Sequence, residues 1–94
     1  MTDDITEGQI ALVRAELHKA QGKFPPMQSA HEGYAIILEE LEELWAEIKN
    51  DKRPEQERLD AMREEALHCC AMSLRFLCDI TAPERNHLVE TEAS

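Results

Sequence analysis

Hydrophobic residues recur every three or four positions between Tyr34 and Lys49, in the segment YAIILEELEELWAEIK. This spacing is typical of an α-helix with one apolar side, so it predicts such a helix here. The acidic residues Glu40, Glu43 and Glu47 recur at the same steps on the opposite side. The apolar positions are Tyr34, Ile37, Leu38, Leu41, Leu44, Trp45 and Ile48.

The run EELEELWAE holds five glutamates in nine residues, of which Glu39 and Glu42 lie between the two sides of the helix. Like charges three or four residues apart destabilise a helix, so the run needs an explanation. A solvated acidic face is one interpretation, because charge runs on helices are usually exposed. Ile36, however, projects close to Glu40 and Glu47, which suggests that this side also faces protein. Carboxylates that face protein must be paired, protonated or bound to a cation.

A first helix is predicted over residues 7 to about 21, with residues 1–5 as a lead-in. Thr6 and Gln9 form a capping-box pattern at its start. Its apolar positions recur at helical spacing, and Gly22 is a natural residue just past its end. The helix carries no motif of its own.

The second helix is predicted to begin after Ser29, with Glu32 as the capping-box partner, and to end near residue 50. Pro25 and Pro26 enforce an extended connection before it. A third helix should follow Pro54, which suits a first helical position, and end near residue 80.

The second half of the third helix is apolar on nearly every side, from Ala66 onward. Three helices of one short chain can hardly cover such a surface, so we expect a subunit interface there. Thr81, Pro83 and Glu84 predict a short last helix through about Val89. Residues 90–94 are expected to form a tail.

Length and composition agree with one all-α domain over residues 1–94, an antiparallel bundle of three main helices completed by oligomerisation. The net charge of −10 argues against nucleic acid and anionic membranes as partners. No apolar run is long enough for a membrane span, and the first residues do not resemble a signal peptide. The cytoplasm is therefore the expected compartment.

The three cysteines are expected to be small core residues in a reducing compartment. Cys69 and Cys70 are neighbours in the third helix and so point apart, and Cys78 follows later in it. No CxxC pattern is present, which argues against a structural zinc site.

Two helical pairs of polar residues could form a metal site. Glu40 and Glu43 share one side of the second helix, and Glu65 and His68 share one side of the third. Helices joined by a short turn pack antiparallel, so the two pairs should face each other. Carboxylates suit Mg²⁺, and an imidazole is tolerated better by Mn²⁺.

The segments SAHEGYAIILEELEELWAEIK and REEALHCCAMSLRFLCDI resemble the MazG-like, all-α nucleoside triphosphate pyrophosphohydrolase superfamily, and its small single-domain phage and bacterial members in particular. The resemblance covers about residues 29–80. The family pattern E-E-x-x-E falls on Glu39, Glu40 and Glu43. Its second pattern, E-x-x-D, falls on Glu65 and His68, with histidine in place of the aspartate.

The resemblance implies hydrolysis of a (deoxy)nucleoside triphosphate to the monophosphate and pyrophosphate, as nucleotide house-cleaning. It implies Mg²⁺ or Mn²⁺ held by Glu40, Glu43 and Glu65, with His68 in the fourth position. Glu39 or Glu47 would orient or deprotonate the attacking water. A homodimer or homotetramer is expected, with the site between the second and third helices.

His68 leaves other interpretations open. It could be a ligand for Mn²⁺, Zn²⁺ or Ni²⁺, a residue that orients a ligand, or a mark of lost activity. The protein could therefore be a degenerate relative that binds nucleotide or metal without turnover. A purely structural helical oligomer with a solvated acidic face is the remaining alternative.

Candidate residues for the substrate come from several places in the chain. Cations for the phosphates are Lys49, Lys52, Arg53 or Arg75, although an exposed surface position explains each of them as well. His31, at the mouth of the second helix, could touch the base or sugar, or lie on the surface.

Aromatic residues have two interpretations as well. Tyr34 and Trp45 could stack on a base, but their helical spacing favours core packing. Phe24, in the loop with the two prolines, is equally compatible with either role. Arg75 could pair with Asp79, one helical turn further along.

Overall fold

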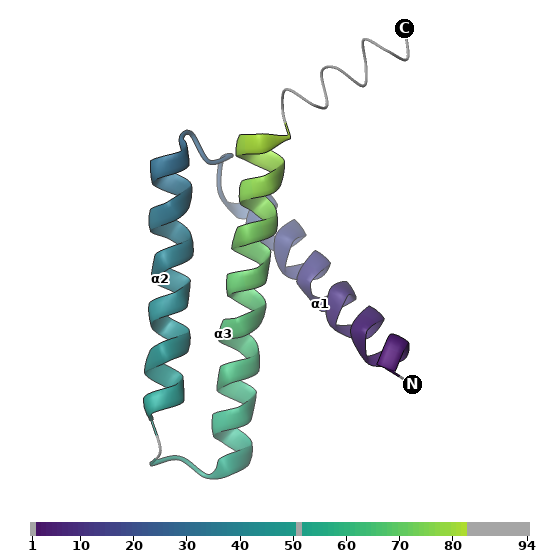
Figure 1. The fold of residues 1–94 in the computed structure, drawn as a ribbon, viewed down its shortest axis with the longest axis vertical. Coiled ribbons are helices and arrows are strands. Elements are labelled where there is room, and N and C mark those ends of the chain that lie inside the picture. The colour runs from purple at the N-terminus through teal and green to yellow at the C-terminus, as the bar shows by residue number, and fades with distance from the viewer. Residues whose placement is uncertain (1, 51, 83–94) are drawn as a thin grey trace, which may run out of the picture.

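A computed structural model of the chain describes residues 2–50 and 52–82. This part of the chain is helical and contains no β-strand, which confirms the all-α expectation (Figure 1). The predicted last helix and the tail lie outside the described residues. The elements are α1 (Thr2–Lys23), α2 (Ala30–Lys49) and α3 (Glu55–Phe76), followed by the π-helical turn η1 (Leu77–Thr81).

Helix α1 is longer at both ends than the capping signals predicted. It begins at Thr2, so residues 2–5 are not a lead-in, and Thr6 lies inside the helix. Gly22 is also helical and does not have a positive φ angle. The N–H of Phe24 donates to the carbonyl of Ala20 at 2.9 Å, so the helical hydrogen bonding continues past the glycine. The predicted boundaries were wrong because threonine and glycine favour helix ends but do not force them, and α1 instead ends just before Phe24 and Pro25, where proline disfavours helical backbone.

Helix α2 begins as the capping pattern predicted. The hydroxyl of Ser29 accepts a hydrogen bond from the N–H of Glu32 at 3.1 Å. The carboxylate of Glu32 accepts from the N–H of Gln28 at 2.5 Å, rather than from Ser29. Both bonds satisfy backbone donors at the start of the helix, which fixes where the loop becomes helical. Pro54 precedes α3 as its cap, one position earlier than predicted.

Helices α2 and α3 run antiparallel side by side, and α1 packs obliquely against α3 (Figure 1). The buried apolar residues are Leu17 and Ala20 of α1, Met27 of the loop and Ala71 of α3. Gly33 allows the close approach of α3, because a Cβ atom there would lie 2.5 Å from Cδ2 of Phe76. The core thus sits where α1, the loop and the start of α2 meet α3. No helix of the described part is both long and apolar enough to cross a membrane.

In the part of the chain that the structure describes, four of the seven apolar positions of α2 are exposed and the other three are half-buried. Tyr34 is 65% exposed and Trp45 is 55% exposed, and Leu41 and Ile48 share this surface. The expectation that Tyr34 and Trp45 pack in the core is therefore wrong for the monomer. On the acidic side, Ile36, Glu40 and Glu47 are half-buried and Glu40 lies beside His68 of α3, whereas Glu43 is exposed. Hydrophobic periodicity identifies an apolar side but not the neighbour that covers it.

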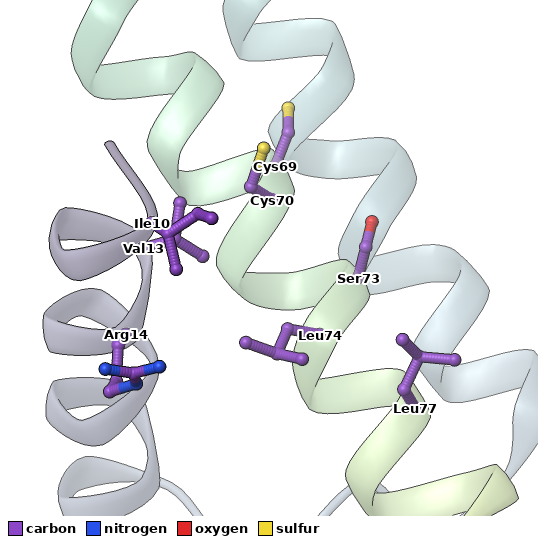
Figure 2. A pocket seen from close by; sticks show the side chains of 8 residues that line it. All are labelled: Ile10, Val13, Arg14, Cys69, Cys70, Ser73, Leu74 and Leu77. Carbon is purple, nitrogen blue, oxygen red and sulfur yellow. The ribbon is translucent and has the colours of Figure 1, made fainter. Parts of the chain in front are cut away.

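A second apolar surface lies in an open groove between α1 and α3, with a volume of about 530 Å³ (Figure 2). Ile10 and Val13 of α1 and Leu74 of α3 point into the space between the two helices. Cys70 lies here and is exposed, so it is not the core residue that the sequence predicted. All three cysteines are free thiols.

Candidate metal centre

Three side chains from α2 and α3 converge as predicted. The Nδ1 atom of His68 lies 3.6 Å from Oε2 of Glu40 and 3.5 Å from Oε1 of Glu65. Ligand atoms of all three residues lie within 4.8 Å of one another. Glu65 and His68 are three residues apart on α3 and therefore share a face. Glu40 meets them because the acidic side of α2 packs against α3.

The other ring nitrogen of His68 faces a second pair of carboxylates. Its Nε2 atom lies 3.6 Å from Oε2 of Glu16, on α1, and 3.8 Å from Oε1 of Glu64. These three residues also form a group whose ligand atoms lie within 4.8 Å of one another. The imidazole thus stands between two carboxylate pairs, and all three helices contribute to the cluster.

The carboxylates of the first group are only partly compensated. Over residues 2–50 and 52–82, Oε2 of Glu40 and Oε2 of Glu65 are buried atoms without a hydrogen-bond partner. Burial raises the pKa of Glu40 above its ordinary value, and the charge of Glu43 adds to this effect. His68 opposes the shift, and Glu39 supports it. Glu40 is therefore less stable as an anion than an ordinary surface glutamate.

Burial also raises the pKa of Glu65, as its largest cause. The neighbouring carboxyl group of Glu43 raises the pKa of Glu65 further, as a hydrogen-bonding group that favours the protonated form. The negative charge of Glu43 acts in the same direction. The neighbouring thiol of Cys69 has a raised pKa as well, first because of burial and then because of Glu40. A protonated thiol is a poor metal ligand, so the donors of this site are oxygen and imidazole nitrogen.

The donor set fits a divalent cation. Two partly buried carboxylates with unpartnered oxygen atoms and an imidazole would each gain a partner from such an ion. A positive charge would also relieve the repulsion that raises both glutamate pKa values. Carboxylates suit Mg²⁺ and Mn²⁺, and the imidazole shifts the preference toward Mn²⁺ and later transition metals.

The other acidic residues of the predicted site lie around this cluster. Glu43 is exposed and is not part of the group formed by Glu40, Glu65 and His68, although its charge acts on both glutamates. Glu39 is exposed and lines a cavity next to Glu40. Glu47 pairs with the guanidinium of Arg53. The predicted roles of Glu43, Glu39 and Glu47 stay predictions.

The predicted substrate-binding residues are spread over both ends of α2. Lys49 lies in its last turn, with its Nζ atom 5.4 Å from the centre of the Trp45 ring. His31 is exposed in its first turn. Arg53 is engaged with Glu47 beyond the end of the helix. None of these residues lines the two cavities beside Glu40.

Arg75 is buried and acts within the fold. Its guanidinium donates to the carbonyl of Pro25 at 2.6 Å, and its Nε atom lies 3.6 Å from Oδ2 of Asp79. The alternative that it pairs with Asp79 is thus confirmed. The same carboxylate oxygen accepts from the N–H of Met27 at 2.9 Å. The pair ties the proline loop to the end of α3, and Arg75 also lines the cavity below that loop.

Two cavities flank the cluster and share Phe24, Glu40 and Met72. One, of about 320 Å³, lies below the proline loop. The other, of about 340 Å³, lies against α1. The first is also lined by Pro25, Pro26, Gln28, Glu32, Ile36, Glu39 and Arg75. The second is also lined by Glu16, Lys19, Ala20, Lys23, His68 and Ala71.

The contribution of α1 to the site was not predicted. Glu16 lies in line with the buried apolar stripe of Val13, Leu17 and Ala20, at helical spacing from two of them. A carboxylate beside an apolar stripe is the sequence signal that could have indicated a buried partner. The identity of that partner, His68, depends on how α1 crosses α3.

Comparisons of the chain with models of known protein families, with curated proteins and with solved structures found no match. The resemblance to the MazG-like pattern therefore rests on the five aligned positions and stays a prediction.

Proposed function

We propose that this protein is a divalent-cation-dependent pyrophosphohydrolase that converts a nucleoside triphosphate to the monophosphate and pyrophosphate. One observation carries the proposal. Buried, unpartnered oxygens of Glu40 and Glu65 converge with His68 at a point between two cavities. Such carboxylates are costly to bury unless a cation or a proton compensates them. The MazG-like pattern on the same residues supplies the reaction class.

In this proposal Glu40, Glu65 and His68 hold Mg²⁺ or Mn²⁺, with Glu43 as a further carboxylate at the edge. The ion would supply charge neutralisation and an acidified water. Glu39 lines the cavity at Glu40, where it would be placed to accept a proton from an attacking water. The oxygen of the water bonds to the α-phosphorus, the bond from this phosphorus to the bridging oxygen breaks, and pyrophosphate leaves. Glu47 is the less suitable base, since Arg53 already pairs with it.

Self-association is part of the proposal. The exposed side of α2, defined by Tyr34, Leu41, Trp45 and Ile48, and the groove between α1 and α3 are both apolar. Large contiguous apolar surfaces on a small domain mark interaction sites. A second copy of the chain would cover them and complete a helical bundle as a homodimer or homotetramer.

A nucleotide-binding protein without turnover is the second candidate, and His68 favours it. The imidazole lies near four carboxylates, so it can serve as an internal partner for them as well as a ligand. His68→Asp tests this candidate directly. Activity gained by the substitution would identify a degenerate site, whereas activity lost would show that the imidazole is needed.

Turnover is the deciding experiment. The purified protein is incubated with a panel of standard and modified nucleoside triphosphates, with Mg²⁺ or Mn²⁺, and pyrophosphate and monophosphate are quantified. Glu65→Gln should abolish release, and the exposed Glu42→Gln is the matched control that should retain it. No release with any nucleotide, together with no effect of cations on the melting temperature, would contradict the proposal and favour a structural oligomer.

A further inference from the structure

Two lysines of α1 line the cavity that ends at the metal cluster. Lys19 and Lys23 are four residues apart, so both project from the same side of α1. Glu40 and His68 form the opposite wall of the same cavity of about 340 Å³. The chain has a net charge of −10, but in this cavity the two ammonium groups equal in number the lining carboxylates, Glu16 and Glu40.

The contacts of these lysines leave them available to a ligand. The Nζ atom of Lys19 lies 3.2 Å from Oε1 of Glu16, and its side chain is 68% exposed. An exposed ion pair of this kind contributes little to stability, so it can be exchanged for a phosphate contact. The Nζ atom of Lys23 lies 6.0 Å from the centre of the Phe24 ring and makes a cation–π contact there.

The cavity below the proline loop has a different character. Besides Phe24 and Met72, which both cavities share, it has apolar walls from Pro25, Pro26 and Ile36, and its polar groups are Gln28, Glu32, Glu39, Glu40 and Arg75. Apolar walls with a few polar groups are typical of sites for flat organic ligands. The Phe24 ring is 54% exposed, although the loop that carries it is held by Arg75 and Asp79. A fixed but exposed ring is suited to stacking on a planar base.

The two cavities meet at Glu40, Phe24 and Met72. A nucleotide that spans both would place its reacting phosphorus at Glu40, where the proposed metal ligands converge. Its base and its terminal phosphates would then lie on opposite sides of that residue. The α1 side carries the ammonium groups of Lys19 and Lys23. The loop side carries the proline walls, and its one cation, the guanidinium of Arg75, already donates to the carbonyl of Pro25.

We infer that Lys19 and Lys23 bind the β- and γ-phosphates of the substrate, and that the cavity under the Phe24–Gln28 loop binds its base. This inference rests on the proposed function, because it assigns the substrate of the same site. It differs from the sequence prediction, in which Lys49 and Arg53 were candidate phosphate ligands. Lys49 therefore supplies a matched control with the same change of charge.

The test measures Lys19→Gln, Lys23→Gln and the variant that carries both changes, and compares them with the control Lys49→Gln. The substrate is a nucleoside triphosphate that the wild-type protein hydrolyses, in the presence of Mn²⁺. Each single variant should raise KM about tenfold, as expected for loss of a charge-assisted contact, and Lys49→Gln should leave KM unchanged. Inorganic tripolyphosphate with Mn²⁺ is the second probe. The lysine variants should weaken its binding as well, and Lys19→Arg should retain it.

Phe24→Leu separates the two parts of the inference. It should raise KM for the nucleotide but leave the affinity for tripolyphosphate unchanged, because the latter has no base. Melting temperatures of all variants, measured without ligand, verify that each one is folded.

Three outcomes distinguish this inference from the proposed function. The double lysine variant could hydrolyse the nucleotide with the KM of the wild type and bind tripolyphosphate with the same affinity. This result would overturn the inference but would not contradict the proposed function. Tripolyphosphate binding that requires both lysines, without turnover of any nucleotide, would support the phosphate site and contradict the hydrolase. A wild-type protein that neither turns over nucleotides nor binds tripolyphosphate would overturn both.

Discussion

Arg75 and Asp79, four residues apart, each bind the backbone of the loop between α1 and α2. The guanidinium of Arg75 donates to the carbonyl of Pro25 at 2.6 Å, and the carboxylate of Asp79 accepts from the N–H of Met27 at 2.9 Å. The two charged groups lie 3.6 Å apart and are both largely buried. The position of Phe24, the first residue of this loop, thus depends on a pair that joins the end of α3 to η1.

Removing one member of this pair should destabilise the fold. Asp79→Asn leaves the buried guanidinium without its counter-charge, so we expect the free energy of unfolding to fall by about 3 kcal/mol. Chemical denaturation measures the change. Arg63→Gln, which removes an exposed pair with Asp60, should cost at most about 1 kcal/mol. Equal effects of the two substitutions would show that the Arg75–Asp79 pair is not a specific anchor.

Gly33→Ala should destabilise the contact between α2 and α3. The added methyl group would lie 2.5 Å from Cδ2 and 2.8 Å from Cε2 of Phe76, so the ring must move. We expect a loss of about 1–3 kcal/mol, in spite of the better helix propensity of alanine. Gly22→Ala is the matched control. Its methyl group meets no atom within 4 Å, so thermal unfolding should show a gain of roughly 0.5–1 kcal/mol.

The metal-free protein should become less stable as the pH rises above the ordinary glutamate pKa of 4.5. The pKa values of Glu40 and Glu65 are raised in the folded state, so this state binds more protons than the unfolded state above pH 4.5. The free energy of unfolding therefore falls with rising pH until both folded-state groups are ionised. Glu65→Gln should raise the melting temperature at neutral pH and reduce this slope. An unchanged slope in the variant would contradict the assignment.

Divalent cations should stabilise the protein at neutral pH. An ion that binds only the folded state raises the melting temperature according to its concentration and affinity. We expect Mn²⁺ to raise it in the wild type and in Glu42→Gln, but not in Glu40→Gln. The effect should decrease in acid, where protons compete for the same carboxylates. A rise of equal size in Glu40→Gln would place the ion elsewhere.

The exposed apolar side of α2 should mediate self-association. Trp45→Glu places a charge in the middle of this surface and should convert the oligomer to monomers. Trp45→Phe keeps the surface apolar and should retain assembly. Size-exclusion chromatography with light scattering measures the mass of each. A wild-type protein that is monomeric at all accessible concentrations would contradict this part of the proposal.

The sequence predicted some of the features that depend on local chemistry, although the signals at Thr6 and Gly22 did not mark the ends of α1. Ser29 and Pro54 marked helix starts to within one residue, because capping and proline act on the backbone beside them. The convergence of Glu40 with Glu65 and His68 followed from helical spacing and a short turn. Glu16 was not predicted, since its contact joins helices far apart in the chain. The direction of the α2 apolar side was likewise undetermined, because helical spacing does not identify the neighbour that covers a side.

The position of His68 between two carboxylate pairs has a consequence for motion. Glu16 reaches the imidazole only while α1 is docked on α3, whereas Glu40 and Glu65 belong to the α2–α3 hairpin. An ion that fixes the imidazole from one side therefore also fixes the surface to which α1 docks. Occupancy of the site should be detectable as slower amide hydrogen exchange along α1, a helix that contributes no residue to the motif.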